Sequence, residues 1–137
     1  MRLYTVAEAR ALLPEVVPVL ETLQSAIRRL KALEAAVAAD ARGASGDGNL
    51  ITTPWEHGDA GKDLEEVLGA QVRRSAAALA GWDIELKDAE RGLIDFHHLR
   101  NGEDVYLCYM LGEPGIQFWH PIAAGFAGRA PIGADED

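Results

Sequence analysis

Side chains that could do chemistry gather in the last third of the chain, around its single cysteine, Cys108. Thiolate and imidazole are ligands that zinc and similar ions accept, so Cys108 with His120 is one candidate metal pair. Asp95 and His97 precede the cysteine and could complete a second set, Asp95, His97 and Cys108. The alternative is a buried small thiol beside polar neighbours, which is the commoner arrangement of a free cysteine.

A second group of polar residues could bind a small ligand without a metal: Asp95, Glu113, His120 and Arg129. His120 could act as a general base, because the ordinary pKa of histidine suits that task. On an apolar face it would instead be a neutral core residue bonded to a carbonyl or an acid. Glycines at 125 and 128 beside Arg129 could bind an anion, although no P-loop or dinucleotide fingerprint accompanies them. Asp95, Glu113 and Arg129 could equally form a structural ion pair that holds the C-terminal segment.

Composition narrows the class of protein. The chain has 137 residues, with 13 Lys and Arg against 22 Asp and Glu, and its formal charge of −9 repels nucleic-acid phosphates and anionic lipid. No uncharged stretch reaches the roughly 18 residues that a membrane span needs, and no apolar leader precedes the first helix. A lone cysteine fits a reducing compartment. We therefore expect a single cytoplasmic domain over residues 1–137 with a solvated acidic tail at 133–137, and no nucleic-acid or membrane partner.

The elements that must position these side chains begin with a helix. Thr5 and Glu8 form a capping box, and apolar residues then recur at alternating spacings of three and four, a seam of the coiled-coil type that needs a partner. This seam consists of Leu13, Val16, Leu20, Leu23, Ile27, Leu30 and, beyond Glu34, Val37. Pro14 and Pro18 predict a bend or a fresh helix start. The glycine-rich stretch 43–48 predicts the end of the helix.

A second helix has two possible starts. Residues 53–56 form a capping box with proline at the first helical position, and Asp63 with Glu66 forms another. Two glycines between these starts favour the later one, at Asp63. The apolar stripe of this helix consists of Leu64, Leu68, Val72, Ala76 and Leu79. The two helices are expected to form a bent hairpin over residues 5–81.

After Trp82 the apolar period changes from about 3.6 to about 2, which predicts strands. The expected strands are residues 83–87, 92–99, 104–111 and 116–120. Asn101 and Gly102 suit a two-residue type I′ turn, because both residues tolerate positive φ. This turn fixes the register of the two strands that flank it.

That register divides the sheet into two faces. One is expected to pack on the helices and carries Ile94, Phe96, His98, Val105, Leu107, Tyr109, Leu111, Ile116, Phe118 and His120. The other carries Leu93, Asp95, His97, Tyr106, Cys108, Met110, Gln117 and Trp119. Under this assignment His120 lies on the opposite face from Cys108, which argues against their pairing as metal ligands. Asp95, which faces Cys108 across the strands, and His97, its diagonal neighbour, are then the expected partners of the thiol.

The second face is too apolar for plain solvent and too polar for a core, so we expect any function to lie there. Leu93, Tyr106, Met110 and Trp119 would form a contiguous apolar patch on it, and such patches usually mark interfaces. The alternative is intramolecular, because residues 121–132 are long enough to fold back over the patch.

Residues 85–132 carry a series of short motifs: Glu-Leu-Lys-Asp, Gly-Leu-Ile-Asp-Phe, Val-Tyr-Leu-Cys-Tyr, Gly-Glu, Trp-His and Gly-Phe-Ala-Gly-Arg. With these motifs, and with Ala-Leu-Leu-Pro in the first helix, the chain resembles along nearly its whole length an uncharacterised bacterial domain-of-unknown-function family, number 2203. The resemblance implies a small prokaryotic protein with no assigned activity. The chain departs from the family pattern at His97, where a proline is common, and at Tyr109, where a tryptophan is common. A role built on His97 would therefore not be a family role.

These patterns predict an α+β fold in which a bent helical hairpin packs on a three- or four-stranded antiparallel meander, with residues 82–132 forming the sheet and the C-terminal segment. One function hypothesis is a non-catalytic interaction or regulatory module that forms a homodimer through the outer sheet face or the helical seam, with a protein partner as a further possibility. The other is a small-ligand or metal-binding protein, or an enzyme, with its site at the strand ends and the C-terminal loop. The sequence identifies no cofactor.

Overall fold

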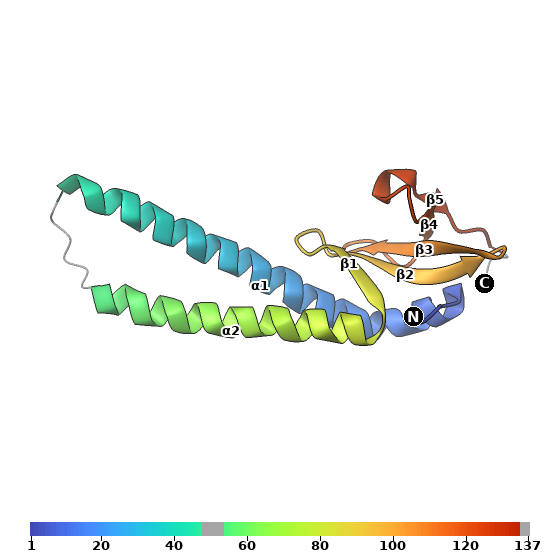
Figure 1. The fold of residues 1–137 in the computed structure, drawn as a ribbon, viewed down its shortest axis with the longest axis horizontal. Helices are drawn as coiled ribbons and strands as arrows, with labels where there is room; N and C mark the ends of the chain where they lie inside the picture. The colour runs from blue at the N-terminus through green and yellow to red at the C-terminus, as the bar shows by residue number, and fades with distance from the viewer. Residues whose placement is uncertain (48–53, 135–137) are drawn as a thin grey trace.

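The computed structural model describes the backbone of residues 1–47 and 54–134, and the side chains of residues 1–39 and 62–134. Two helices are followed by an antiparallel sheet, which confirms the α+β class (Figure 1). The elements are α1 (Val6–Asp47), α2 (Pro54–Gly81), β1 (Ile84–Asp88), β2 (Leu93–Arg100), β3 (Glu103–Met110), β4 (Phe118–Pro121), the short 3₁₀ helix η1 (Phe126–Gly128) and β5 (Ala130–Pro131). Within these described residues, neither α-helix is long and apolar enough to span a membrane.

The helix α1 begins at the predicted capping box. The Thr5 amide donates to Glu8 Oε1 at 2.9 Å, and the Glu8 amide donates to Thr5 Oγ1 at 3.0 Å. The helix then continues through both prolines, so the predicted fresh start is wrong, although its axis changes direction between the turns beneath the sheet and the part beside α2 (Figure 1). Pro14 and Pro18 are exposed, whereas the seam residues around them are buried. Burial of those residues offsets the two missing backbone hydrogen bonds.

One of the two predicted helix ends around the hairpin turn is wrong. The helix α1 ends at Asp47, within the predicted 43–48 stretch, but α2 begins at Pro54 rather than at Asp63. Proline at the first helical position favours the observed start, since its missing amide is one that has no intrahelical partner there. Each glycine inside α2 costs only about 1 kcal/mol, which a long helix tolerates. Thr53 of the predicted capping box lies outside the described residues.

The sheet is an antiparallel meander of five strands in the order β1-β2-β3-β4-β5, one or two strands more than predicted. Asn101 and Gly102, with φ of 52° and 82°, form the predicted turn between β2 and β3. The predicted register is confirmed, because Asp95 pairs with Cys108 and His97 pairs with Tyr106.

The core lies between the sheet and the end of the hairpin next to the sheet, where residues 6–23 of α1 and Leu79 of α2 contribute to it (Figure 1). The N-terminal segment is tied to β2, because the Tyr4 amide donates to the His97 carbonyl at 2.7 Å and the Tyr4 carbonyl lies 2.7 Å from His98 Nδ1. The Tyr4 ring meets Phe96 edge to face. The buried apolar residues of this core are Tyr4, Val6, Ala9, Leu13, Val16, Leu20, Leu23, Leu79, Ile84, Ile94, Phe96, Leu107, Tyr109 and Ile116.

The strand β4 has the opposite face assignment from the predicted one. Tyr106 pairs with His120, and Leu107 pairs with Trp119. His120 and its neighbour Phe118 therefore share the outer face with Tyr106 and Cys108, while Trp119 packs against the core on the helix side. The reason is local: residues 116–117 are not in a strand, so the alternation does not carry across them from the buried Ile116 to β4.

Candidate functional site

The outer side of the sheet, away from the helices, contains polar side chains that are almost completely buried. Asp95 on β2, Cys108 on β3 and His120 on β4 have exposed fractions of 2%, 1% and 2%. The chain after β4 crosses this side of the sheet, and η1 lies over it (Figure 1). Three neighbouring central strands thus each contribute one titratable group to a site that the C-terminal segment closes.

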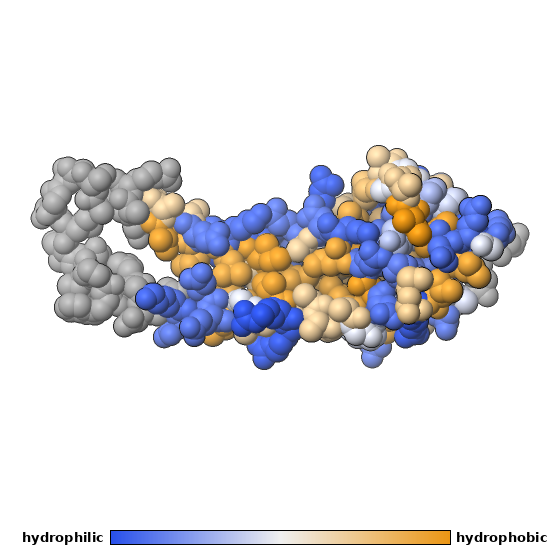
Figure 2. All heavy atoms as spheres, viewed as in Figure 1, coloured by the Kyte–Doolittle hydropathy of each residue, from blue (hydrophilic) through white to orange (hydrophobic). Residues whose placement is uncertain are grey.

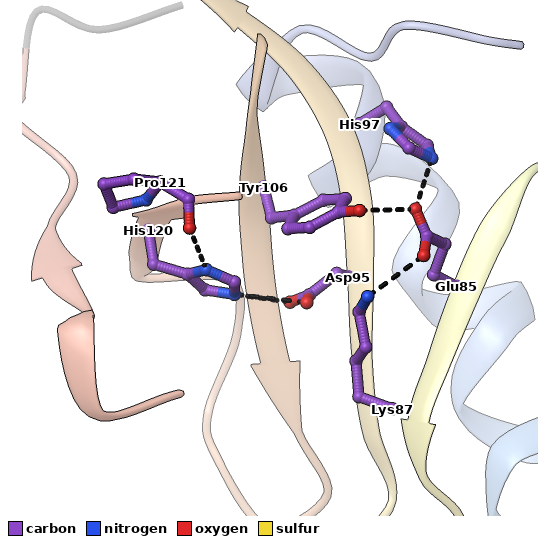
Figure 3. A network of polar contacts seen from close by, with 7 residues as sticks. All are labelled: Glu85, Lys87, Asp95, His97, Tyr106, His120 and Pro121. Carbon is purple, nitrogen blue, oxygen red and sulfur yellow. Dashed lines mark hydrogen bonds and ion pairs between the residues drawn. The ribbon is translucent and has the colours of Figure 1, made fainter. Parts of the chain in front are cut away.

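Both ring nitrogens of His120 are hydrogen-bonded (Figure 3). Nδ1 lies 2.9 Å from the carbonyl oxygen of Pro121, and because a carbonyl only accepts, Nδ1 carries a proton and donates it. Nε2 lies 3.1 Å from each carboxylate oxygen of Asp95. The hydrogen bond between Nε2 and the carboxylate needs one proton, which lies between these two groups.

Burial controls the protonation of the other two groups. It raises the pKa of Asp95, and the adjacent His120, through its charge and its hydrogen bond, opposes this rise. Burial, reinforced by the negative charge of Asp95, raises the pKa of the Cys108 thiol to about 12, although the nearby Arg129 acts in the opposite direction. Cys108 is therefore a neutral thiol at pH 7.

The three groups form one cluster. One ligand atom each from Asp95, Cys108 and His120 all lie within 4.8 Å of one another, and they are the one such group of three found among the described residues. Cys108 and His120, whose pairing the predicted face assignment argued against, thus lie together. His97 is outside this cluster, so the structure does not bring the predicted set of Asp95, His97 and Cys108 together, and His120 joins Asp95 and Cys108 instead.

His97 belongs instead to a neighbouring network centred on Glu85 (Figure 3). Glu85 accepts hydrogen bonds from the Tyr106 hydroxyl at 2.7 Å and from Lys87 Nζ at 3.0 Å, and His97 Nε2 lies 2.7 Å from the same carboxylate. The hydrogen bond from Tyr106 is the main cause that lowers the pKa of Glu85. Glu85 and Lys87 were not among the site residues predicted from the sequence. The signal was available, because alternation along β1 puts Glu85 beside Asp95 on one face.

A cavity of about 140 Å³ adjoins the cluster. Asp95, Cys108 and His120 all line it, so each ligand atom belongs to a residue that borders open space. The remaining lining residues are Lys87, Leu93, Tyr106, Ile122, Gly125 and Phe126. Since one water occupies about 30 Å³, the cavity has room for an ion and a ligand of a few atoms.

Glu113 and Arg129 form the structural ion pair that was one of the two predicted alternatives. Glu113 also accepts a hydrogen bond from the Met110 amide at 2.7 Å. The Arg129 guanidinium lies over the rings of Phe118, at 4.0 Å, and Phe126, at 4.5 Å. The four predicted ligand-binding residues therefore separate into two pairs, Asp95 with His120 and Glu113 with Arg129, and the second pair fixes the segment that covers the first.

The predicted interface patch is not a free surface. Leu93 and Tyr106 are buried, with exposed fractions of 8% and 6%, and Met110 is half-buried. Trp119 lies on the helix side, where the Arg100 guanidinium is 4.0 Å from its ring centre. Ile122 and Phe126 of the C-terminal segment border the same cavity as Leu93 and Tyr106. The intramolecular alternative thus describes this face.

Comparison with known proteins agrees with the resemblance seen in the motifs. Residues 2–132 match the family described as "Uncharacterized conserved protein (DUF2203)". No curated protein and no solved structure matches the chain. Because the match spans nearly all of its residues, the chain belongs to this uncharacterised conserved family, DUF2203.

Proposed function

We propose that this protein binds a Zn²⁺ ion through Asp95, Cys108 and His120. The observation that carries the proposal is the convergence of three buried ligand atoms, from three separate strands, to within 4.8 Å of one another. A thiolate, an imidazole and a carboxylate are all common zinc ligands, whereas Mg²⁺ and Ca²⁺ prefer oxygen ligands alone.

The hydrogen bonding of His120 supports this role. Metal-binding histidines almost always donate their other ring N–H to a carbonyl or a carboxylate, which fixes the ring and its tautomer. In His120, Nδ1 donates a hydrogen bond to the Pro121 carbonyl. Nε2 faces Asp95, and both His120 and Asp95 line the cavity. The ion would take the place of the proton between Nε2 and Asp95 and of the thiol proton of Cys108.

The distances are compatible with a modest closure around an ion. Zinc–ligand bonds of roughly 2.0–2.3 Å in a tetrahedron separate the ligand atoms by about 3.4–3.8 Å. Side-chain movements of about 1 Å would bring the present cluster, with separations of up to 4.8 Å, to that geometry. Three protein ligands leave the fourth position of the tetrahedron open, and the adjoining cavity of about 140 Å³ would hold a water or a small ligand there.

Metal titration of the full chain tests the proposal. Metal-free protein titrated with ZnCl₂ is expected to bind one equivalent by native mass spectrometry and calorimetry, and Cys108→Ser and His120→Gln are each expected to weaken binding by about 100-fold. Co²⁺ is expected to give a thiolate-to-metal charge-transfer absorption that Cys108→Ser abolishes. His97→Gln is the matched control, because His97 contacts Glu85 and not the cluster, and its affinity is expected to stay unchanged.

Two results would overturn the proposal. One is a wild-type protein that takes up no zinc at micromolar concentration while its melting curve shows it to be folded. The other is zinc uptake that survives both Cys108→Ser and His120→Gln, because the ion would then be bound elsewhere in the chain.

A further inference from the structure

The cavity beside the Asp95–Cys108–His120 cluster has a cation at its border. Among the described residues that line this cavity, Lys87 of β1 is the one lysine or arginine, and Asp95 is the one carboxylate. The charges of Lys87 and Asp95 are close enough to influence each other. Figure 3 shows the Lys87 side chain reaching the space between the carboxylates of Asp95 and Glu85. A ligand that enters the cavity therefore meets a positive charge next to the metal ligands.

Two contacts hold the Lys87 ammonium in this position. It donates a hydrogen bond to Glu85 at 3.0 Å, and it lies 4.6 Å from the centre of the Tyr106 ring. An ammonium has more than one donor hydrogen, so the bond to Glu85 leaves a donor for a ligand. Glu85 also accepts a hydrogen bond from Tyr106 and contacts His97, and it does not line the cavity. Its negative charge is therefore spread over several partners and neutralises Lys87 only in part.

Zinc binding would leave Lys87 as the charge of the cavity that no metal bond uses. The two positive charges of the ion are balanced by the Asp95 carboxylate and the Cys108 thiolate, while His120 binds as a neutral imidazole. The metal site is then neutral, and Lys87 is the charged residue that remains along the described lining. A monoanion at the open fourth position would balance this charge, whereas a dianion would add an unpaired charge at a buried site.

The volume and the apolar walls of the cavity limit the size of that anion. At about 30 Å³ for each water, the cavity of about 140 Å³ holds about four or five atoms other than hydrogen, and the ion takes the place of one. Leu93, Ile122 and Phe126 form apolar parts of the wall. A carboxylate of the size of acetate fits this space, because one oxygen can bind the metal while the other accepts a hydrogen bond from Lys87 and the methyl group faces the apolar wall.

We propose, on the basis of the zinc site proposed above, that this site takes a small carboxylate monoanion of the size of acetate as its fourth ligand. Lys87 is the cationic partner of that anion. Because Lys87 contacts the ligand and not the metal, its removal is expected to change the affinity for the anion without changing the affinity for zinc.

Titration of the cobalt-loaded full chain with acetate tests the class of ligand. Acetate at millimolar concentration and constant ionic strength is expected to change the visible absorption of the bound Co²⁺. Acetamide has the shape of acetate without its charge, and pivalate has the same charge with a bulky tert-butyl group. Each is expected to bind at least about tenfold more weakly than acetate, acetamide because it lacks the charge and pivalate because it exceeds the cavity.

Variants of the Glu85–Lys87 pair test the cation. Lys87→Met is expected to weaken acetate binding about tenfold, while its zinc dissociation constant, measured by calorimetry, stays within about threefold of wild type. Glu85→Gln is expected to strengthen acetate binding about threefold, because the neutral amide competes less for the ammonium. Lys31→Met is the matched control, because Lys31 pairs with Glu90 on the surface, and both affinities are expected to stay unchanged.

The outcomes distinguish this proposal from the zinc site on which it rests. A wild-type protein that takes up no metal would overturn both. Uptake of zinc and cobalt with no response to acetate would overturn the ligand class alone, as would an equal response to acetamide. An equal response to pivalate would overturn the size limit. If Lys87→Met binds acetate as tightly as wild type does, Lys87 is not the partner of the anion.

Discussion

His120 shows how the bonding of a single residue decides its chemistry. The residue type alone allows a general base, a core histidine or a metal ligand. Both ring nitrogens are hydrogen-bonded, Nδ1 to the Pro121 carbonyl and Nε2 to Asp95, so neither offers a free lone pair that could abstract a proton from a substrate. A metal ion can still reach Nε2, because it replaces the proton that His120 shares with Asp95.

Cys108 is expected to react slowly with iodoacetamide in the folded, metal-free protein. Its pKa of about 12 leaves roughly one thiol in ten thousand ionised at pH 8, against about a quarter for an ordinary cysteine of pKa near 8.5. Timed alkylation followed by mass spectrometry is therefore expected to be at least about 100-fold slower in buffer than in urea. Equal rates in the two solvents, from a protein that circular dichroism shows to be folded, would contradict the raised pKa.

At the scale of elements, the sequence predicts structure best where a local motif sets the geometry. The Asn101–Gly102 turn fixes its own φ values, so the β2–β3 register and the pairing of Asp95 with Cys108 follow directly. The β4 register fails because the irregular residues 116–117 interrupt the alternation, and with it fails the face of His120. That one-residue shift is why the composition of the cluster was not predictable, although all three of its members were candidates.

The turn before β2 depends on Gly92, and alanine there is expected to destabilise the protein strongly. Gly92 has φ of 65°, and an added Cβ would lie 2.5 Å from side-chain atoms of Leu111. Backbone strain and this overlap together are expected to cost about 2–4 kcal/mol in the free energy of unfolding. Gly102→Ala is the control, because its φ of 82° brings strain but no atom within 4 Å, and about 1 kcal/mol is expected. Urea denaturation measures the free energy of unfolding of both variants. Equal losses would show that the overlap with Leu111 does not contribute to the cost at Gly92.

The segment after β4 is expected to loosen when its ion pair is removed. Arg129→Met breaks the contact with Glu113 but keeps an apolar stem against Phe118 and Phe126. We expect faster hydrogen exchange in residues 121–132, and Cys108 alkylation about tenfold faster than in wild type, with exchange in both helices unchanged. Arg91→Met is the control, because its ion pair with Asp88 is on the surface. If Cys108 is alkylated at the wild-type rate in both variants, Arg129 does not hold residues 121–132 in place over the cluster.

At the scale of the whole molecule, the fold separates two surfaces. The polar cluster lies on the outer side of the sheet, whereas exposed apolar side chains, Val37 and Val67 among them, lie on the hairpin that extends away from that sheet (Figure 1 and Figure 2). The heptad-like seam predicted the need for a partner, and α2 supplies that partner as far along the hairpin as Leu68, which is fully buried. Val37 of the same seam is 60% exposed, because periodicity counts the apolar residues on a face and does not show how far along the hairpin that face is covered.

Zinc is expected to raise the melting temperature, and to raise it more at pH 8 than at pH 6. Binding must displace the Cys108 proton, and because the pKa of that thiol is about 12, it stays protonated across this whole range. Affinity then rises by at least about tenfold per pH unit, so about 100-fold over two units, which adds about 2.7 kcal/mol of stabilisation in excess zinc.

Thermal melts with and without zinc at the two pH values measure this difference, and a chelator is expected to reverse it. His97→Gln is expected to keep the pH dependence and Cys108→Ser to reduce it, because serine carries no thiol proton for the metal to displace and only the proton between His120 and Asp95 remains to be displaced. A zinc-induced rise of the same size at both pH values would mean that no protonated ligand yields to the ion. The thiol of Cys108 would then lie outside the coordination shell, whatever else in the chain holds the metal.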